Sequence, residues 1–169
     1  IVPKKMPESL LVIGSGAIGI EFASFYNALG CKVTIVEVQD RILPVEDIEI
    51  SKFAHKAFEK QGMTFLTSTT VEKLEVVKNK VNATIKMATG MSEQTFDNAI
   101  VAVGIVGNTE ELGLEPTKVV VERNQIHVNK WCQTHEQGIY AIGDVAGAPW
   151  LAHKASHEGV MVAEQIAGL

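Results

Sequence analysis

Short apolar runs and amphipathic stretches alternate along the first part of the chain. Residues 10–13 are all apolar and end at a glycine, as in a strand that is buried on both faces of a parallel sheet. Apolar residues then recur at helical spacing from 18 to 29, and Gly30 stands where a helix end favours a positive φ. A second apolar run follows at 33–36. The pattern predicts strand, glycine turn, helix and strand, which is one βαβ unit with a right-handed crossover.

The alternation continues and is then interrupted by a pattern of period two. A second amphipathic helix is indicated at 50–58, followed by a strand at 64–67. Between about 71 and 95 apolar and polar residues alternate, with turns expected at 78–80 and at Gly90. The apolar positions are Ile50, Phe53, Ala57 and Phe58 in the helix, and Val81, Ala83, Ile85 and Met87 on one face of the alternating segment. We therefore expect an antiparallel meander inserted into an α/β frame.

The pattern of hydrophobic and polar residues changes near residue 107. Before this point, residues 99–103 predict another buried strand. After it come a loop rich in glycine, asparagine and proline, an extended stretch around Ile126, an apolar strand at 139–142 and a helix from about 151 to 167. The apolar side of that helix consists of Ala152, Ala155, Gly159, Val162 and Ile166.

Composition and charge narrow the classes of function. The chain has 169 residues, 46% of them hydrophobic, which is enough for an ordinary core. Its 20 acidic and 15 basic residues give a net charge of -5 without long runs, so we expect neither nucleic-acid binding nor a basic membrane-binding face. No apolar stretch approaches the roughly 20 residues that span a bilayer. Cys31 and Cys132 match neither a CxxC pair nor a zinc-ligand spacing, and we expect structural or surface thiols in a reducing compartment.

Three glycines mark the turn between the first strand and the first helix. Gly14, Gly16 and Gly19 form the pattern GxGxxG directly after an apolar strand. The first glycine permits a tight turn, the second lets a pyrophosphate approach the backbone, and the third lets helix and strand pack closely. The first helical residues, Ala17 and Ile18, then offer unpaired N–H groups to an anion. The pattern predicts a dinucleotide site; a tight turn with no ligand is the alternative.

An acid at the end of the second strand indicates which dinucleotide binds. Glu37 lies 18 residues after Gly19, close to the spacing at which a carboxylate accepts hydrogen bonds from the adenosine ribose. The 2'-phosphate of NADP would meet this carboxylate, and residues 38–40 offer no base to neutralise it; only Arg41 is near. We therefore expect NAD. The alternative is that Glu37 is an ordinary solvated strand end.

The expected fold class is α/β, with a Rossmann-like parallel sheet, an inserted antiparallel β-meander and a further strand-helix segment. We expect residues 1–106 to form the NAD-binding domain. Residues 107–169 are expected to be a separate central segment.

Over essentially its whole length the chain resembles the flavoprotein disulfide reductases, and within that family the dihydrolipoamide dehydrogenases. The segment GSGAIGIE, residues 14–21, resembles their NAD fingerprint, which implies that Glu21 lies beside nicotinamide and flavin. A first-turn acid that stabilises the helix is the structural alternative for Glu21. The expected NAD contacts also include Val71 and Gly104.

Two later segments resemble the flavin contacts of the same family. IYAIGDV, residues 139–145, is similar to its second FAD motif, which implies that Asp144 binds the ribityl chain; a turn or helix cap is the alternative. LAHKASHEG, residues 151–159, is the part most similar to the dihydrolipoamide dehydrogenases. It implies that Leu151, Ala152 and His153 approach the flavin pyrimidine edge. His153 and His157 are four residues apart, but no third ligand cluster supports a metal site.

The chain also departs from the family pattern. Ile105 and Gly107 stand where the family commonly has arginine and proline, which puts an arginine contact to the cofactor in doubt, and Trp150 replaces a common methionine. The family's redox cysteine pair and its His-Glu acid-base pair have no counterpart among these residues. We therefore expect no catalytic residue in this chain. Because the first residue is Ile1 rather than methionine, we also expect the chain to be a portion of a longer protein.

The resemblance implies an FAD-dependent oxidoreductase that passes electrons from dihydrolipoyl groups through a disulfide and FAD to NAD. Its implied partner is the lipoyl-bearing acyltransferase of a 2-oxoacid dehydrogenase complex, and the full enzyme would be a homodimer in the cytoplasm, or in the mitochondrial matrix of a eukaryote. Two other readings remain open. One is another NADH-linked flavoprotein disulfide reductase or an NADH oxidase, and the other is a nucleotide-binding module without turnover.

Overall fold

A computed structural model describes residues 3–169. The chain divides into two compact units, one ending at Val103 and the other running from Gly104 to Leu169. The division falls three residues before the boundary expected from the sequence.

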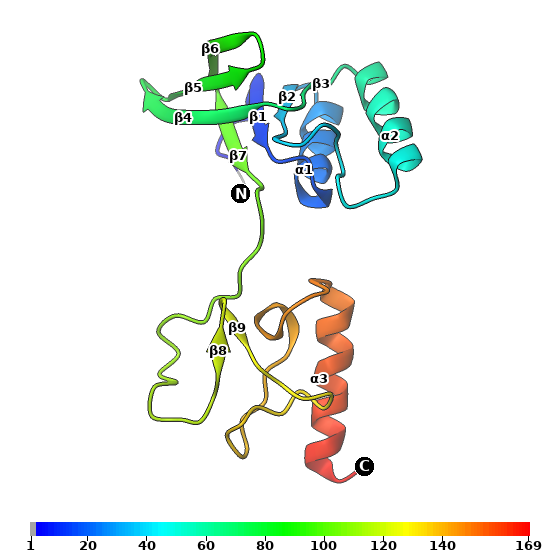
Figure 1. The fold of residues 1–169 in the computed structure, drawn as a ribbon, viewed down its shortest axis with the longest axis vertical. Helices are drawn as coiled ribbons and strands as arrows, with labels where there is room; N and C mark the ends of the chain where they lie inside the picture. Colours follow the sequence, from blue (N-terminus) through cyan, green and yellow to red (C-terminus); the bar gives the residue numbers. More distant parts are fainter. Residues whose placement is uncertain (1–2) are drawn as a thin grey trace. The chain divides into compact units, whose positions relative to one another are not determined.

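The first unit is built on a parallel sheet with the strand order β3-β2-β1-β7 (Figure 1). Its strands are β1 (Ser9–Ile13), β2 (Lys32–Val36), β3 (Thr64–Leu66) and β7 (Asn98–Val101). In the register of the central pair, Leu10 lies opposite Val33 and Val12 opposite Ile35. These residues are almost fully buried, as the unbroken apolar runs predict for strands covered on both faces. The parallel α/β sheet is confirmed.

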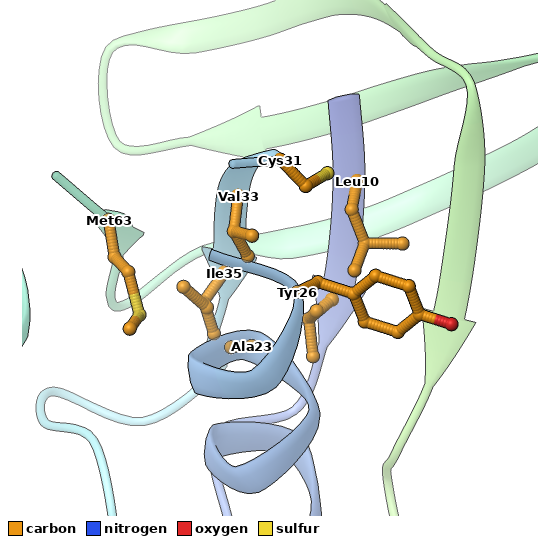
Figure 2. Close-up of a cluster of buried hydrophobic side chains, with 8 residues drawn as sticks. Leu10, Ala23, Tyr26, Cys31, Val33, Ile35 and Met63 are labelled. Atoms are coloured by element: carbon orange, nitrogen blue, oxygen red, sulfur yellow. The ribbon is translucent and has the colours of Figure 1, made fainter. Parts of the chain in front are cut away.

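Two helices accompany this sheet, α1 (Ala17–Ala28) and α2 (Ile48–Lys60). Ala23 and Tyr26 of α1 pack with strand residues in one buried cluster, which Figure 2 shows. The buried members of that cluster are Leu10, Val12, Ala23, Tyr26, Cys31, Val33, Ile35 and Met63. Asp47 is the N-cap of α2, and its carboxylate accepts hydrogen bonds from the amides of Glu49 and Ile50. Gly30 has a φ of 90°, so the expected glycine end of α1 is confirmed.

The expected meander is also confirmed. Its strands are β4 (Thr70–Val77), β5 (Lys80–Met87) and β6 (Gly90–Phe96), paired antiparallel in the order β4-β5-β6. Ala83 and Ile85 pack with Leu11 and Val36 of the parallel sheet in a second buried cluster. The carboxylate of Asp97 accepts hydrogen bonds from the amide of Ser9, so the end of the meander is also tied to β1.

The second unit contains less regular structure. Its elements are the strands β8 (Val121–Glu122) and β9 (Gln125–Ile126), the 3-10 helix η1 (Gly143–Ala146) and the helix α3 (Ala152–Ala167). Ile126, Cys132 and Ala141 form its buried apolar positions. Gly107 is buried there, and a Cβ on it would lie 2.3 Å from the carbonyl oxygen of Asn124. No side chain fits at Gly107 without a shift of the backbone, so in this conformation the chain also has no room for the family's proline.

One expectation for the second unit is wrong, and another holds only in part. Residues 139–142 do not form a strand, because only Tyr140 finds a bridge partner, Gln133, and no sheet neighbour is present in the described chain. In helix α3, Ala155 and Val162 are partly buried, whereas Ala152 and Ile166 are exposed. The face that packs is therefore narrower than the apolar stripe in the sequence.

Two expectations for the first unit also fail in part. Strand β7 ends at Val101 rather than at Val103, and both side chains are exposed. β7 is an edge strand with a neighbour on one side only, so its end is not buried as a central strand would be. In α2, Phe58 packs against the core, but Ile50 and Phe53 are exposed.

Candidate dinucleotide site

Two of the three motif glycines are required by the fold itself. Gly14 has a φ of 97°, and a Cβ there would lie 2.4 Å from the carbonyl oxygen of Ala102. A Cβ on Gly19 would lie 2.0 Å from the carbonyl oxygen of Gly14. Side chains at these positions would separate α1 from the ends of β1 and β7. Both glycines are thus explained by close packing alone.

Gly16 differs from the other two glycines. It precedes α1 in an extended conformation, with φ -65° and ψ 178°, and a Cβ there would meet nothing within 4 Å. Neither a positive φ nor close packing requires a glycine here. A molecule that approaches the backbone closely would explain it.

The N-terminus of α1 is also free of compensating groups. No side chain caps it, and its first turn contains no acidic residue. The first N–H groups of a helix have no partner within the helix and carry a partial positive charge. Ala17 and Ile18 are exposed at this end. Glu21 is exposed and lies beyond the first turn, so its structural alternative as a first-turn acid is wrong.

Glu37 is fixed at the carboxyl end of β2, beside the glycine turn. Its Oε2 accepts hydrogen bonds from the amide of Ser15 at 2.9 Å and from the Ser15 hydroxyl at 2.7 Å. Its Oε1 accepts one from the amide of Gln39 at 2.8 Å. The residue is only 6% exposed, so the reading of Glu37 as a solvated strand end is wrong.

These hydrogen bonds determine the charge of Glu37. Burial acts to raise the pKa of this carboxyl, but hydrogen bonds from Gln39, Ser15 and Val38 outweigh it and hold the pKa below its ordinary value. The carboxylate is therefore ionised at neutral pH. The backbone of Glu37 is also hydrogen-bonded to the segment at the end of β3. The Glu37 amide donates to the carbonyl of Leu66, and the Glu37 carbonyl accepts from the amide of Thr69.

Ser15 is the residue that sequence reasoning missed. It is fully buried, and both its amide and its hydroxyl reach the same carboxylate oxygen. Its carbonyl also accepts a hydrogen bond from the amide of Leu43, which ties the following loop to the turn. The only signal in the sequence was a small hydroxyl residue between two glycines, which by itself points to no partner.

The base nearest to Glu37 in sequence is already engaged. Arg41 donates from Nη2 to the carbonyl of Pro44 at 2.8 Å and pairs weakly with Asp40 at 3.4 Å. This geometry leaves the guanidinium directed at its own loop. The arrangement favours a ligand without an extra phosphate beside Glu37.

The remaining expected NAD contacts lie at different places. Val71 is partly buried, and its side chain packs against the second core cluster. Gly104, with φ 149°, is the first residue of the second unit.

The expected flavin contacts lie together in the second unit. Asp144 is exposed in η1, while Leu151, Ala152 and His153 are exposed at the start of α3. Their exposure leaves these residues accessible to a ligand.

A charged pair on α3 holds the loop that carries Asp144. The amide of Gly143 donates to Glu158 Oε2 at 2.8 Å, and Lys154 Nζ donates to the carbonyls of Gly143 and Gly147. Lys154 and Glu158 also pair with each other at 3.0 Å. Burial acts to raise the pKa of Glu158, but the Gly143 amide and Lys154 outweigh it and keep that pKa below its ordinary value. The pair thus fixes both main-chain groups of the residue next to Asp144.

Other chemistry finds little support among residues 3–169. Within this range no group of three or more histidine, cysteine or acidic side chains could hold a metal ion. No described helix has the length and apolar character needed to cross a membrane. Cys31 and Cys132 are free and buried, and burial raises the pKa of both thiols.

Residues 1–159 match the family described as pyridine nucleotide-disulphide oxidoreductase. The chain belongs to this family. Among curated proteins it is 51% identical to the dihydrolipoyl dehydrogenase of Rhizobium etli over 99% of its length, and 50% identical to that of Zymomonas mobilis over 98%. It spans only 35% and 36% of the length of these two relatives.

Solved structures of family members have the same fold. The flavoprotein disulfide reductase RclA from Escherichia coli matches with a TM-score of 0.89 and 29% identity, over 98% of this chain and 38% of that one. LpdA from Mycobacterium tuberculosis matches with a TM-score of 0.85 and 30% identity, over 98% of this chain and 36% of that one. The sheet and meander described above are therefore those of the pyridine nucleotide-disulphide oxidoreductases.

Proposed function

We propose that this chain is the NAD-binding portion of a dihydrolipoamide dehydrogenase, together with a segment that completes its FAD domain. The observation that carries the proposal is the contrast among the motif glycines. Gly14 and Gly19 are explained by packing, whereas Gly16 faces open space and needs a ligand to explain it. The high identity to two dihydrolipoyl dehydrogenases supports the choice of enzyme within the family.

In this proposal the first unit binds and orients NAD. The free N–H groups after Gly16 bind the diphosphate, where each favourable charge at a helix N-terminus gains about 0.3 to 1 kcal/mol. The ionised Glu37 accepts hydrogen bonds from the adenosine ribose. Glu21, which is exposed on α1, would lie beside the nicotinamide. The cofactors themselves, when bound, supply the hydride chemistry.

The second unit would contribute to the FAD site. The exposed carboxylate of Asp144 can accept hydrogen bonds from ribityl hydroxyls, and the exposed start of α3 at Leu151, Ala152 and His153 can meet the flavin ring. The Lys154–Glu158 pair keeps the loop before Asp144 in place. Residues 139–142, which lack a sheet neighbour here, would pair with strands of the FAD domain outside this chain.

The whole enzyme would oxidise dihydrolipoyl groups on the acyltransferase of a 2-oxoacid dehydrogenase complex, as a homodimer in the cytoplasm or the mitochondrial matrix. The redox cysteines and the acid-base histidine would be supplied from outside the chain. This chain alone would then position cofactors but would not turn over.

The test compares the complete gene product with the 169-residue chain. We expect the complete protein to retain FAD and to reduce NAD with dihydrolipoamide, and the chain with added FAD to show no turnover. A complete protein that oxidises NADH with oxygen or another disulfide, but not with lipoamide, would indicate one of the other flavoprotein reductases. Turnover by the chain alone would contradict the assignment of the catalytic residues.

A further inference from the structure

We propose that Ser15 is a positioning residue that sets the preference for NAD over NADP. It holds the Glu37 carboxylate in the one orientation that accepts the adenosine ribose and repels a 2'-phosphate. The inference rests on the proposed function, because it requires that Glu37 meets the ribose.

The geometry shows that Ser15 acts through Glu37 rather than on a ligand. Ser15 is 0% exposed, so its hydroxyl has no access to a bound molecule. Its amide and its hydroxyl both donate to Oε2 of Glu37, at 2.9 and 2.7 Å. A hydroxyl that donates its only hydrogen bond to a buried carboxylate restricts the rotation of that carboxylate.

The hydrogen bonds to Glu37 are distributed unequally between its two carboxylate oxygens. A carboxylate offers about four lone-pair sites, two on each oxygen. The Oε2 of Glu37 accepts two hydrogen bonds from Ser15, whereas Oε1 accepts one at 2.8 Å from the amide of Gln39. The remaining acceptor capacity therefore lies on the side of Oε1. Ser15 thus keeps Oε1 in a fixed place, where it can accept from a ribose hydroxyl.

The same fixation excludes a phosphate. A 2'-phosphate beside an immobile, ionised carboxylate meets like charge at short range, and the carboxylate cannot rotate away while Ser15 holds it. The nearest base in sequence, Arg41, contacts the carbonyl of Pro44 and pairs weakly with Asp40, both in its own loop. Without the Ser15 hydroxyl, the Glu37 side chain regains freedom to turn.

The experiment uses the complete gene product with Ser15→Ala, Glu37→Gln and the double variant, in steady-state assays with NAD and NADP. We expect Ser15→Ala to raise the KM for NAD about tenfold, because the Glu37 carboxylate loses its fixed orientation toward the ribose, with kcat within twofold of wild type. The preference for NAD over NADP should fall by a similar factor. In the Glu37→Gln background the same serine change should have little further effect. Ser92→Ala, the same chemical change on β6, is the matched control.

Each outcome supports or overturns the inference. A folded Ser15→Ala protein with wild-type KM and wild-type NAD preference would overturn it, as would an equal effect of the serine change with and without Glu37. If Ser15→Ala does not fold, Ser15→Cys carries the test, because a thiol fills the space of the hydroxyl, although it is somewhat larger, and donates only weakly. Unchanged KM and preference in that variant would overturn the inference as well. A wild-type protein that NAD does not saturate would overturn the proposed function instead.

Discussion

Substitution of each of the three motif glycines by alanine distinguishes glycines required for stability from a glycine required for NAD binding. At Gly19 the added Cβ would lie 2.0 Å from the carbonyl oxygen of Gly14, and at Gly14 it would lie 2.4 Å from that of Ala102. Overpacking of this kind costs about 1 to 3 kcal/mol. The φ of 97° at Gly14 adds about 1 to 2 kcal/mol of backbone strain for a residue with a Cβ. We therefore expect Gly14→Ala to lose roughly 2 to 5 kcal/mol of unfolding free energy and Gly19→Ala roughly 1 to 3.

The expectation for Gly16→Ala is the opposite. Its extended conformation suits alanine, and the smaller entropy of the unfolded chain gains about 0.4 to 1 kcal/mol. Alanine is a poorer N-cap than glycine by a similar amount, so the two effects nearly cancel. Stability should stay within about 1 kcal/mol of wild type. The added methyl group lies where the diphosphate would approach, and NAD affinity should fall at least tenfold.

Urea denaturation followed by far-UV circular dichroism measures the stability of the three variants of the chain. Titration calorimetry with NAD on the complete gene product measures affinity. Wild-type NAD affinity in Gly16→Ala would refute the ligand explanation of that glycine. Wild-type stability in Gly19→Ala would refute the packing argument.

Four further predictions concern other parts of the chain. Glu37→Ala should weaken NAD binding by about 1 to 3 kcal/mol in calorimetry, the scale of a lost charged hydrogen bond; unchanged affinity would remove Glu37 from the site. Lys154→Met leaves Glu158 and the Gly143 loop without their cation, so the complete protein should lose FAD on dilution faster than wild type, as flavin fluorescence would report. Hydrogen bonds from Lys80 and the amide of Ser9 lower the pKa of Asp97 to about 2 from 3.8, so its contribution to stability is present above about pH 4 and is lost as the pH falls toward 2. Asp97→Asn should therefore flatten the loss of stability over that pH range, and an unchanged acid profile would contradict this. Hydrogen exchange of the isolated chain should show weaker protection in residues 107–169 than in β1 and β2, because residues 139–142 have a single bridge and no strand neighbour among the described residues.

The elements whose partners lie within the chain were predictable from its sequence. The apolar runs at 10–13 and 33–36 form the buried centre of the parallel sheet, and the period-two segment forms the meander. Local patterns suffice in these cases because each strand finds its neighbour among the residues present. The glycine end of α1 is also a local matter of one positive φ.

The segments that differ from the prediction lack a neighbour on at least one side among the described residues. Residues 139–142 read as a buried strand but have no sheet to join, and the end of β7 reads as buried but lies at an edge. Sequence patterns report what a segment can bury, not whether a neighbour is present.

The candidate site was predictable in its residue types but not in its hydrogen bonding. Spacing alone identified Glu37 and the three glycines. The role of Ser15 depends on two turns meeting in space, 22 residues apart in sequence, and only the structure shows that contact. The difference between Gly16 and its neighbours likewise needs coordinates, because all three are the same letter in the motif.

The most direct test is a crystal structure of the complete gene product with NAD. The account predicts the diphosphate on the backbone N–H groups that follow Gly16, with the adenosine ribose hydrogen-bonded to Oε1 of Glu37. NAD bound elsewhere, or a diphosphate remote from the start of α1, would contradict it.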